Sequence, residues 1–176
     1  LPDEQAWSDS MGTTALLVFR RDSLLFEQYR EGNQNTLSNS FSMAKSITSM
    51  LVGIALEEGF IRSIDDKVGD YLDAYRTGMD TLLTIRHLLD MTSGIPCGES
   101  YSSPLGYMAK SYYGKDLTAT TLDYHVQKQP GTLWAYEGGN TVLLGMILTK
   151  ATGMSVSDYC STRLWSRIGA EQDAYW

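Results

Sequence analysis

The sequence predicts an α+β fold in which two strands are followed by a long series of helices. Three observations favour this class. Apolar residues alternate with other residues over positions 13–30, as in a β-hairpin. From position 41 onward, apolar residues recur at helical spacing in segments that end near glycine. The 176 residues are the usual size of one domain, and 43% of them are hydrophobic, which is enough for a packed core.

The predicted hairpin lies in TTALLVFRRDSLLFEQYR, residues 13–30. Apolar residues alternate on both sides of a polar turn at 21–23: Leu16, Val18, Leu24 and Phe26. Because two strands alone do not form a stable sheet in water, the hairpin needs partner strands. We therefore expect residues 12–40 to be the edge hairpin of a larger antiparallel sheet whose remaining strands are missing from this chain. Residues 1–176 would then form one incomplete domain.

The first predicted helix lies in FSMAKSITSMLVGIALEEG, residues 41–59. Four apolar residues at helical spacing form its predicted buried stripe: Ile47, Met50, Leu51 and Ile54. Ser42 has the residue type that begins helices, and Gly59 suits the left-handed conformation that ends them. We expect residues 41–176 to be mostly helical, with further helices near 84–91, 105–113, 118–127, 141–152 and 155–167.

Charge and composition exclude several functional classes. The net charge of −7 and the pI near 4.7 argue against non-specific nucleic-acid binding, which requires a basic face. The longest apolar runs, 50–56 and 141–148, are too short to span a bilayer, so we expect no transmembrane segment. The opening residues, LPDEQAWSDS, do not resemble a secretory signal. Cytoplasmic and periplasmic or secreted locations both stay open.

The cysteines and histidines do not predict a metal site. Cys97 and Cys160 are either bridged or two free thiols, and the sequence permits both. Two cysteines and two histidines without short spacing do not match a zinc motif. We expect His87 to have a structural role among apolar neighbours and His125 to be solvated. No metal and no cofactor is expected.

Ser42 and Lys45 are the first candidate catalytic residues. Residues at i and i+3 share one helix face, with Cβ atoms roughly 5–6 Å apart. A serine hydroxyl needs a base to become a nucleophile, and a lysine whose pKa is lowered by burial can be that base. Backbone N–H groups at the start of the helix could form part of an oxyanion hole. The alternative is structural, because serine is a common N-cap and lysine a common helix residue.

The motifs around this pair resemble those of a known family. The string SFSMAKSITSMLVGIALEEGFIRSIDDKVGDYL, residues 40–72, resembles the active-site region of the penicillin-recognising serine hydrolases: class C β-lactamases, D-alanyl-D-alanine carboxypeptidases and related esterases. TIRHLLDMTSGI and PGTLWAYEGGNTVLLGMILTKATG continue the resemblance in the same order. The ending LWSRIGAEQDAYW is similar to the esterase and 6-aminohexanoate-oligomer hydrolase branch. The resemblance covers nearly all of the chain and implies the N-terminal half of a β-lactamase/transpeptidase-like fold.

The resemblance also implies a mechanism. Ser42 would attack a carbonyl and form an acyl-enzyme, while Lys45 takes the proton directly or through a tyrosine. Tyr136 matches the tyrosine of the family's Tyr-x-Asn motif, and it would return a proton to the leaving group and help to activate the deacylating water. The Ser42 N–H would donate one of two oxyanion hydrogen bonds. The alternative for Tyr136, one of 11 tyrosines, is a packing role in a loop.

Two departures from the family pattern affect the substrate and the completeness of the site. The Tyr-x-Asn motif reads Tyr136-Glu137-Gly138, so the substrate-contacting asparagine is absent. The Gly138 backbone and Asn140 are the candidates to take its place. The family's third motif, Lys-Thr-Gly or His-x-Gly, is not found after Tyr136. We expect that motif on a C-terminal half that is a separate or missing polypeptide.

The predicted substrate is a small-molecule ester or linear amide. The absent asparagine favours the esterase or oligomer-amidase branch over recognition of a β-lactam or a peptide amide side chain. Tyr112 belongs to an aromatic run that either lines a substrate cleft or packs internally. One alternative function is that of a β-lactamase or D-Ala-D-Ala carboxypeptidase. The alternative of another class is a non-catalytic binding module that keeps the fold, and the fragment itself could be inactive without its C-terminal half.

Overall fold

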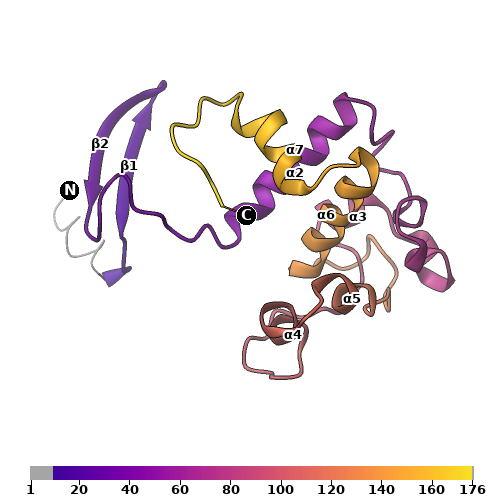
Figure 1. Ribbon diagram of the computed structural model, residues 1–176. Helices are drawn as coiled ribbons and strands as arrows, with labels where there is room; N and C mark the ends of the chain where they lie inside the picture. The colour runs from indigo at the N-terminus through magenta and orange to yellow at the C-terminus, as the bar shows by residue number, and fades with distance from the viewer. Residues whose placement is uncertain (1–9, 176) are drawn as a thin grey trace. The chain divides into compact units, whose positions relative to one another are not determined.

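The structure is a computed structural model that describes residues 10–175. Its contacts divide the chain into two units, Leu1–Phe41 and Ser42–Trp176. The first unit contains a β-hairpin, and the second contains the helices α2 to α7 (Figure 1). This order, with strands first and helices afterwards, is the α+β order that the sequence predicts.

The hairpin consists of β1 (Ala15–Arg20) and β2 (Ser23–Tyr29), which pair antiparallel. Arg21 and Asp22 connect the strands with positive φ angles of 47° and 62°. Two residues with positive φ form the type of turn whose twist matches that of the flanking strands. The prediction of a hairpin within 13–30 is therefore confirmed.

The faces of the hairpin are largely uncovered. Six apolar side chains of its strands are exposed: Leu17, Val18, Phe19, Leu24, Leu25 and Phe26. In the part of the chain that the structure describes, the sheet has two strands and no third. Because a single hairpin is marginally stable in water, this exposure agrees with the expectation that the sheet requires further strands.

Helix α2 (Met43–Glu57) begins directly after Ser42, which is its N-cap residue. The helix ends at Glu58, and Gly59 follows with a φ of 77°, a left-handed conformation that glycine adopts without strain. Both boundaries agree with the prediction. The start of α2 matters for function, because it places Ser42 at the N-terminal end of the helix, where backbone N–H groups lack intrahelical acceptors.

The buried face of α2 differs from the predicted stripe. The buried residues are Thr48, Leu51, Val52 and Ala55. Met50, which the sequence places in the stripe, is 46% exposed, and Ile47 and Ile54 are only partly buried. The prediction for Met50 is wrong because the packed face is set by contact with α6 rather than by the apolar residues alone.

Helix α6 (Gly138–Thr152) is central to the second unit. It contacts α2, α3 (Ile85–Leu89) and α5 (Leu117–Leu122), and Figure 1 shows it between α2 and α5. Its fully or nearly fully buried side chains include Leu143, Leu144, Ile147 and Leu148. It ends at Gly153, as predicted, but begins at Gly138 rather than at residue 141. The earlier start places the N-terminus of α6 next to Tyr136.

Three short 3₁₀ helices precede α3: η1 (Val68–Asp70), η2 (Asp73–Tyr75) and η3 (Gly78–Leu82). Helix α3 is held at its start by a capping box, in which the Thr84 hydroxyl accepts from the His87 N–H and the His87 Nδ1 accepts from the Thr84 N–H at 3.2 Å. Burial lowers the pKa of His87, which favours the neutral ring that this bond needs. The predicted structural role of His87 is confirmed.

His125 is exposed, as expected, with 49% of its side chain accessible, but it also has a carboxylate partner. Its Nδ1 lies 2.7 Å from Oδ2 of Asp80, whose other carboxylate oxygen accepts a hydrogen bond from the Val126 N–H at 2.7 Å. Asp80 is only 5% exposed. The sequence does not predict this contact, because Asp80 is remote from His125 in the chain and comes from η3. Helix α5 ends at Leu122, earlier than the predicted residue 127.

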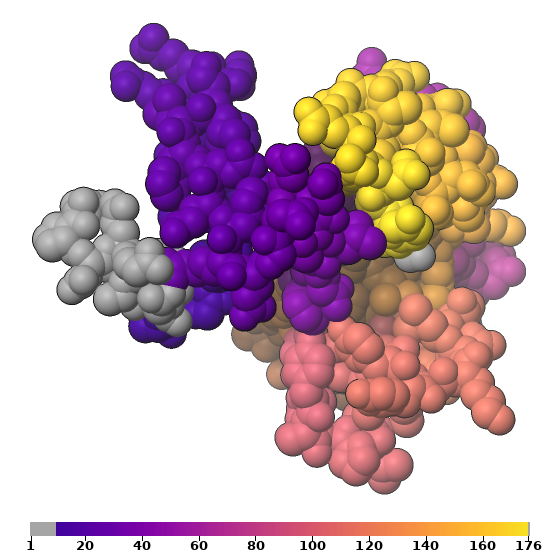
Figure 2. Space-filling model, turned by 60° about the vertical axis from the view of Figure 1, so that its left-hand side comes forward, coloured from indigo at the N-terminus to yellow at the C-terminus, as the bar shows by residue number. Residues whose placement is uncertain are grey.

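Helix α4 (Tyr107–Tyr113) and helix α5 form a small subdomain at one side of the second unit. Figure 2 shows this region, coloured pink to salmon, as a lobe that stands out from the rest of that unit. The Tyr107 hydroxyl lies 3.0 Å from the Thr121 hydroxyl, and the Tyr107 ring meets Tyr124 edge to face at 5.2 Å. These contacts join the two helices to each other and to the loop that follows.

The chain ends in α7 (Val156–Cys160) and the π-helical turn η4 (Ser161–Trp165). The Ser155 hydroxyl caps α7 by accepting from the Asp158 N–H at 3.0 Å. Cys97 and Cys160 are both buried free thiols, so of the two alternatives the unbridged one is present. Within the described residues, no helix combines the length and the apolar character needed to cross a bilayer.

Candidate active site

The hydroxyl of Ser42 contacts Lys45 rather than the backbone. The Lys45 Nζ donates a hydrogen bond to the Ser42 Oγ at 3.3 Å. Among the described residues, the Ser42 side chain makes no capping bond to the start of α2, although Ser42 is the N-cap residue. An N-capping role therefore explains the position of Ser42 but leaves its hydroxyl free to react.

The backbone just before Ser42 is strained. Phe41 has a φ of 42°, which lies in the left-handed region that bulky residues rarely adopt. Such conformations cost free energy and cluster at functional sites, where the surrounding structure maintains them. The strain occurs one residue before the candidate nucleophile.

Tyr136 joins Ser42 and Lys45. The Lys45 Nζ lies 4.9 Å from the centroid of the Tyr136 ring. The pKa of the Tyr136 phenol is lowered, first by a hydrogen bond with Ser42, then by a hydrogen bond and the positive charge of Lys45. Partial burial and the negative charge of Glu99 oppose this effect. The structure thus brings together the three residues that the sequence singles out as catalytic.

The segment before Tyr136 is fixed by the loop that follows α3. The Ala135 N–H donates to the Met91 carbonyl at 2.9 Å, and the Gly131 N–H donates to the Thr92 carbonyl at 2.8 Å. Met91 itself has a φ of 57°. These bonds position a loop tyrosine that lies far from Ser42 in sequence.

The structure does not favour the two proposed replacements for the missing asparagine. The Gly138 N–H donates to Oε1 of Glu99, so this donor is already occupied. Asn140 is fully buried, and its amide nitrogen lies 3.5 Å from the Met91 sulfur. Asn140 therefore does not reach back to the exposed surface on which Ser42 lies, because α6 begins early and turns its side chain inward.

Tyr112 is 63% exposed and lies beside Tyr101, with ring centroids 6.4 Å apart. The pKa of Tyr101 is raised by partial burial and by Glu99, while the charge of Lys45 lowers it. Tyr101 therefore connects Tyr112 to the vicinity of Lys45. A role for Tyr112 in substrate binding stays a prediction.

Sequence reasoning missed Glu99 as a neighbour of the site, and it named Tyr101 only as a member of the aromatic run that includes Tyr112. Glu99 acts on the charge states of both Tyr136 and Tyr101. Both residues lie in the loop after α3, which the sequence marks only as rich in proline, glycine and serine. Neither carries a periodic signal, and an acidic residue in such a loop is ordinarily solvated.

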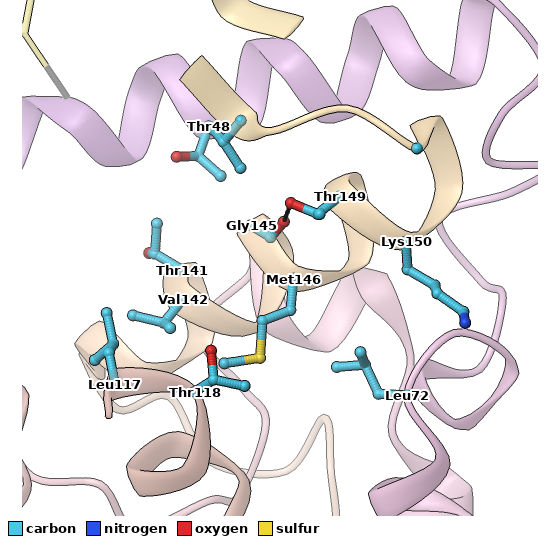
Figure 3. Close-up of a pocket in the computed structure, with 12 residues that line it drawn as sticks. Thr48, Leu72, Leu117, Thr118, Thr141, Val142, Gly145, Met146, Thr149 and Lys150 are labelled. Carbon is cyan, nitrogen blue, oxygen red and sulfur yellow. Dashed lines mark hydrogen bonds between the residues drawn. The ribbon is translucent and has the colours of Figure 1, made fainter. Parts of the chain in front are cut away.

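An open pocket of about 760 Å³ lies beside α6, away from this chemistry (Figure 3). Met146 of α6 points across it toward Thr118 of α5, and Thr48 of α2 lies on its far side. The Thr149 hydroxyl is already bonded to the Gly145 carbonyl at 3.0 Å. Its lining residues do not include Ser42, Lys45 or Tyr136, so the candidate active site is the surface around Ser42. In residues 10–175, no three His, Cys, Asp or Glu side chains are grouped to hold a metal ion.

A family model and several curated proteins match this chain. A family model described as Beta-lactamase matches residues 4–175. The chain is 29% identical over 140 residues to penicillin-binding protein 4* of Bacillus subtilis (strain 168), covering 78% of this chain and 30% of that protein. It is 27% identical over 192 residues to 6-aminohexanoate-dimer hydrolase of Paenarthrobacter ureafaciens, covering 99% of this chain and 47% of that protein. The chain thus spans less than half the length of these relatives.

A solved structure shares the fold. The penicillin binding protein from Bacillus halodurans matches with a TM-score of 0.75 and 20% sequence identity, covering 98% of this chain and 57% of that one. At this identity the likeness concerns the fold and not the activity. The hairpin and the helices of the two units both fall within the matched part of the chain.

Proposed function

The chain belongs to the Beta-lactamase family, a family of hydrolases, and on that premise we propose that it is a serine hydrolase that forms an acyl-enzyme on Ser42 with an ester or a linear amide. The single observation that carries the proposal is the convergence on the Ser42 hydroxyl. The Lys45 Nζ lies 3.3 Å from the Ser42 Oγ and 4.9 Å from the centroid of the Tyr136 ring, and interactions with both side chains lower the pKa of the Tyr136 phenol.

In the proposed acylation step, the Ser42 Oγ forms a bond to the substrate carbonyl carbon and its proton passes to Lys45 or to the Tyr136 phenolate. The lowered pKa of Tyr136 supports the second route, because it increases the fraction of phenolate available as a base. When the tetrahedral intermediate collapses, the ester or amide bond breaks and the same proton goes to the leaving group. Water then repeats the sequence to release the acid.

The oxyanion of the intermediate requires hydrogen-bond donors. Ser42 lies at the N-terminal end of α2, where backbone N–H groups have no intrahelical acceptor and the helix dipole favours negative charge. The Ser42 N–H is the first donor in this proposal. The second donor would come from a part of the fold beyond this chain, which spans less than half the length of its curated relatives.

We prefer an ester or a linear amide over a β-lactam as the substrate, because one residue of the family motif differs in this chain. The position after Tyr136-Glu137 is Gly138, which has no side-chain amide, and its N–H is bonded to Glu99. A binding site lacking that amide has less to offer a substrate that carries an amide side chain. The similarity to a 6-aminohexanoate-dimer hydrolase supports the same branch.

Two other functions define the test. The similarity to penicillin-binding protein 4* favours a β-lactamase or D-Ala-D-Ala carboxypeptidase. The alternative of another class is a non-catalytic module that keeps the fold. The first differs from our proposal in substrate, and the second differs in whether Ser42 reacts at all.

The test is covalent labelling of Ser42 with a fluorophosphonate and a p-nitrophenyl acyl ester, read by mass spectrometry. We expect labelling of the wild type and of Ser49→Ala, which removes an exposed hydroxyl from the same helix. Ser42→Ala should not be labelled. The chain is tested alone and together with a C-terminal half taken from a relative. Absence of labelling in both would favour the binding module, and turnover of a chromogenic cephalosporin faster than the ester would favour the β-lactamase.

A further inference from the structure

Glu99 and Glu137 make reciprocal hydrogen bonds between two segments of the chain. The Gly138 N–H donates to Oε1 of Glu99, and the Gly98 N–H donates to Oε2 of Glu137 at 2.5 Å. Each bond joins residues 39 apart in sequence. Bonds from backbone N–H groups to carboxylates are charge-assisted and stronger than neutral ones. We call these two bonds the glutamate pair.

The position of Glu99 follows from the start of α6. The first N–H groups of a helix lack intrahelical acceptors, and the helix dipole favours an anion there. Glu137 is the N-cap residue of α6, yet its own side chain makes no capping bond among the described residues. Glu99 accepts from the Gly138 N–H in its place. The carboxylate of a remote loop thus satisfies the N-terminus of the helix.

The burial of Glu137 explains the second bond, the one from the Gly98 N–H. Glu137 is only 8% exposed, and burial raises its pKa. A buried carboxyl group is costly unless hydrogen bonds satisfy it. The Gly98 N–H supplies such a bond. The two glutamates therefore hold the loop at 97–99 and the start of α6 together from both sides.

Two glycines permit this close approach. A Cβ atom on Gly138 would lie 2.8 Å from Oε1 of Glu99, and one on Gly139 would lie 2.4 Å from the Cys97 sulfur. Both distances are shorter than real Cβ contacts. Neither glycine has a positive φ. Their role is therefore to leave space for the loop, which explains two poor helix formers at the start of α6.

Tyr136 directly precedes this junction. Its backbone is held on one side by the Ala135 bond to Met91, and on the other by the glutamate pair. We propose that Glu99 and Glu137 are positioning residues that hold Tyr136 against Ser42 and Lys45. This inference rests on the proposed function of Tyr136. Neither glutamate touches the reacting atoms in this proposal, and both act through Tyr136.

A purely structural role would stabilise the fold without affecting the chemistry of Tyr136, and this difference can be measured. The groups that act on the Tyr136 phenol are Ser42 and Lys45 from α2 and Glu99 from the loop. The negative charge of Glu99 raises the pKa of Tyr136 against the effect of Lys45. Glu99→Gln removes that charge and keeps an oxygen that can accept from the Gly138 N–H. The pKa of Tyr136 should then fall, and the pH profile of acylation should move to lower pH.

The first experiment follows the Tyr136 phenol by NMR in protein labelled with [ζ-¹³C]tyrosine. We expect its titration midpoint to be lower in Glu99→Gln than in the wild type. The matched control is Glu57→Gln, which removes an exposed charge from the last residue of α2 and should leave the midpoint unchanged. An unmoved Tyr136 midpoint in Glu99→Gln would overturn the role of Glu99.

The second experiment measures acylation of Ser42 by the p-nitrophenyl ester. Glu99→Ala and Glu137→Met each remove one of the two bonds, and we expect kcat to fall ~10–100-fold with a smaller change in KM, because the catalytic group is displaced. Glu99→Gln should retain most of the rate. Amide hydrogen exchange should become faster at Gly138 in Glu99→Ala and at Gly98 in Glu137→Met.

The outcomes separate this inference from the proposed function. Wild-type acylation with unchanged rates in folded Glu99→Ala and Glu137→Met would overturn the inference. A wild type that is never acylated would overturn the proposed function, while the Tyr136 midpoint and the exchange rates would still test the positioning of Tyr136. If Glu137→Met does not fold, the partly exposed Glu99 variants decide the result alone.

Discussion

At the scale of single residues, the partner of the Ser42 hydroxyl distinguishes a reactive serine from a capping one. A capping serine accepts from a backbone N–H of the first helical turn, whereas the Ser42 Oγ accepts from the Lys45 Nζ. The capping alternative therefore accounts for the position of Ser42 but not for its contacts. The helix provides this geometry without any tertiary contact, because residues three apart share a face.

Lys45→Met tests the base at this scale. The variant removes the amine that lies against both the Ser42 hydroxyl and the Tyr136 ring, and labelling of Ser42 should slow by roughly 10²–10⁴-fold. It also removes the hydrogen bond and the charge that lower the pKa of Tyr136, so that pKa should rise and the remaining reaction should require higher pH. The measurement is the rate of fluorophosphonate labelling as a function of pH. Lys150→Met, an exposed lysine on α6, is the control, and equal rates in both variants would contradict the assignment.

At the scale of elements, the start of α6 is decided by contacts with the loop after α3. Intrinsic propensity disfavours two glycines at the start of a helix. The structure nevertheless begins α6 at Gly138, because Glu99 accepts from its N–H and the Cys97 side chain fills the space beside Gly139. Tertiary contacts thus override a local preference here.

Gly139→Ala should destabilise the second unit, although alanine is the better helix former. The added Cβ would lie 2.4 Å from the Cys97 sulfur, and overpacking of this kind costs ~1–3 kcal/mol. The matched control is Gly145→Ala on the same helix, where the Cβ would lie 3.6 Å from Val156. That variant should gain about 0.5–1 kcal/mol from helix propensity. Urea unfolding of the two variants measures both effects, and a stabilised Gly139→Ala would contradict the packing described.

Asp80→Ala should also destabilise the second unit. The buried carboxylate holds His125 and the Val126 N–H, and leaving a buried donor unpaired costs ~1–3 kcal/mol. Asp73→Ala is the control, because its ion pair with Arg76 is exposed and should contribute less than about 1 kcal/mol. Thermal unfolding compares the two. Equal losses would mean that the Asp80 contacts add nothing beyond a surface charge.

At the scale of the whole molecule, the chain shares the β-lactamase/transpeptidase-like fold that the sequence predicts, while spanning less than half the length of its curated relatives. The two units differ in how well their apolar side chains are buried. The helices of the second unit enclose a core, whereas the hairpin leaves both faces exposed.

Amide hydrogen exchange should reflect this difference. Strands β1 and β2 should exchange orders of magnitude faster than the buried turns of α2 and α6, because an isolated hairpin is marginally stable. Adding a C-terminal half from a relative should slow exchange in the strands if it completes the sheet. Strands as protected as the helices in the chain alone would show that the hairpin is already covered.

The sequence by itself determined the features that depend on local geometry. Apolar periodicity and terminal glycines located the hairpin and most helix boundaries, and the spacing of Ser42 and Lys45 placed both on one helical turn. Three to four residues suffice for each of these relations. The resemblance in motif order then identified Tyr136 and the family.

Only the tertiary structure decided which distant groups meet. It joined Tyr136 to Ser42 and Lys45, paired His125 with Asp80, and placed Glu99 at the start of α6. It also turned Asn140 into the core and moved the buried face of α2 away from Met50. The physical reason is that these contacts depend on how helices and loops pack, and a contact between residues far apart in the chain leaves no periodic trace in the sequence.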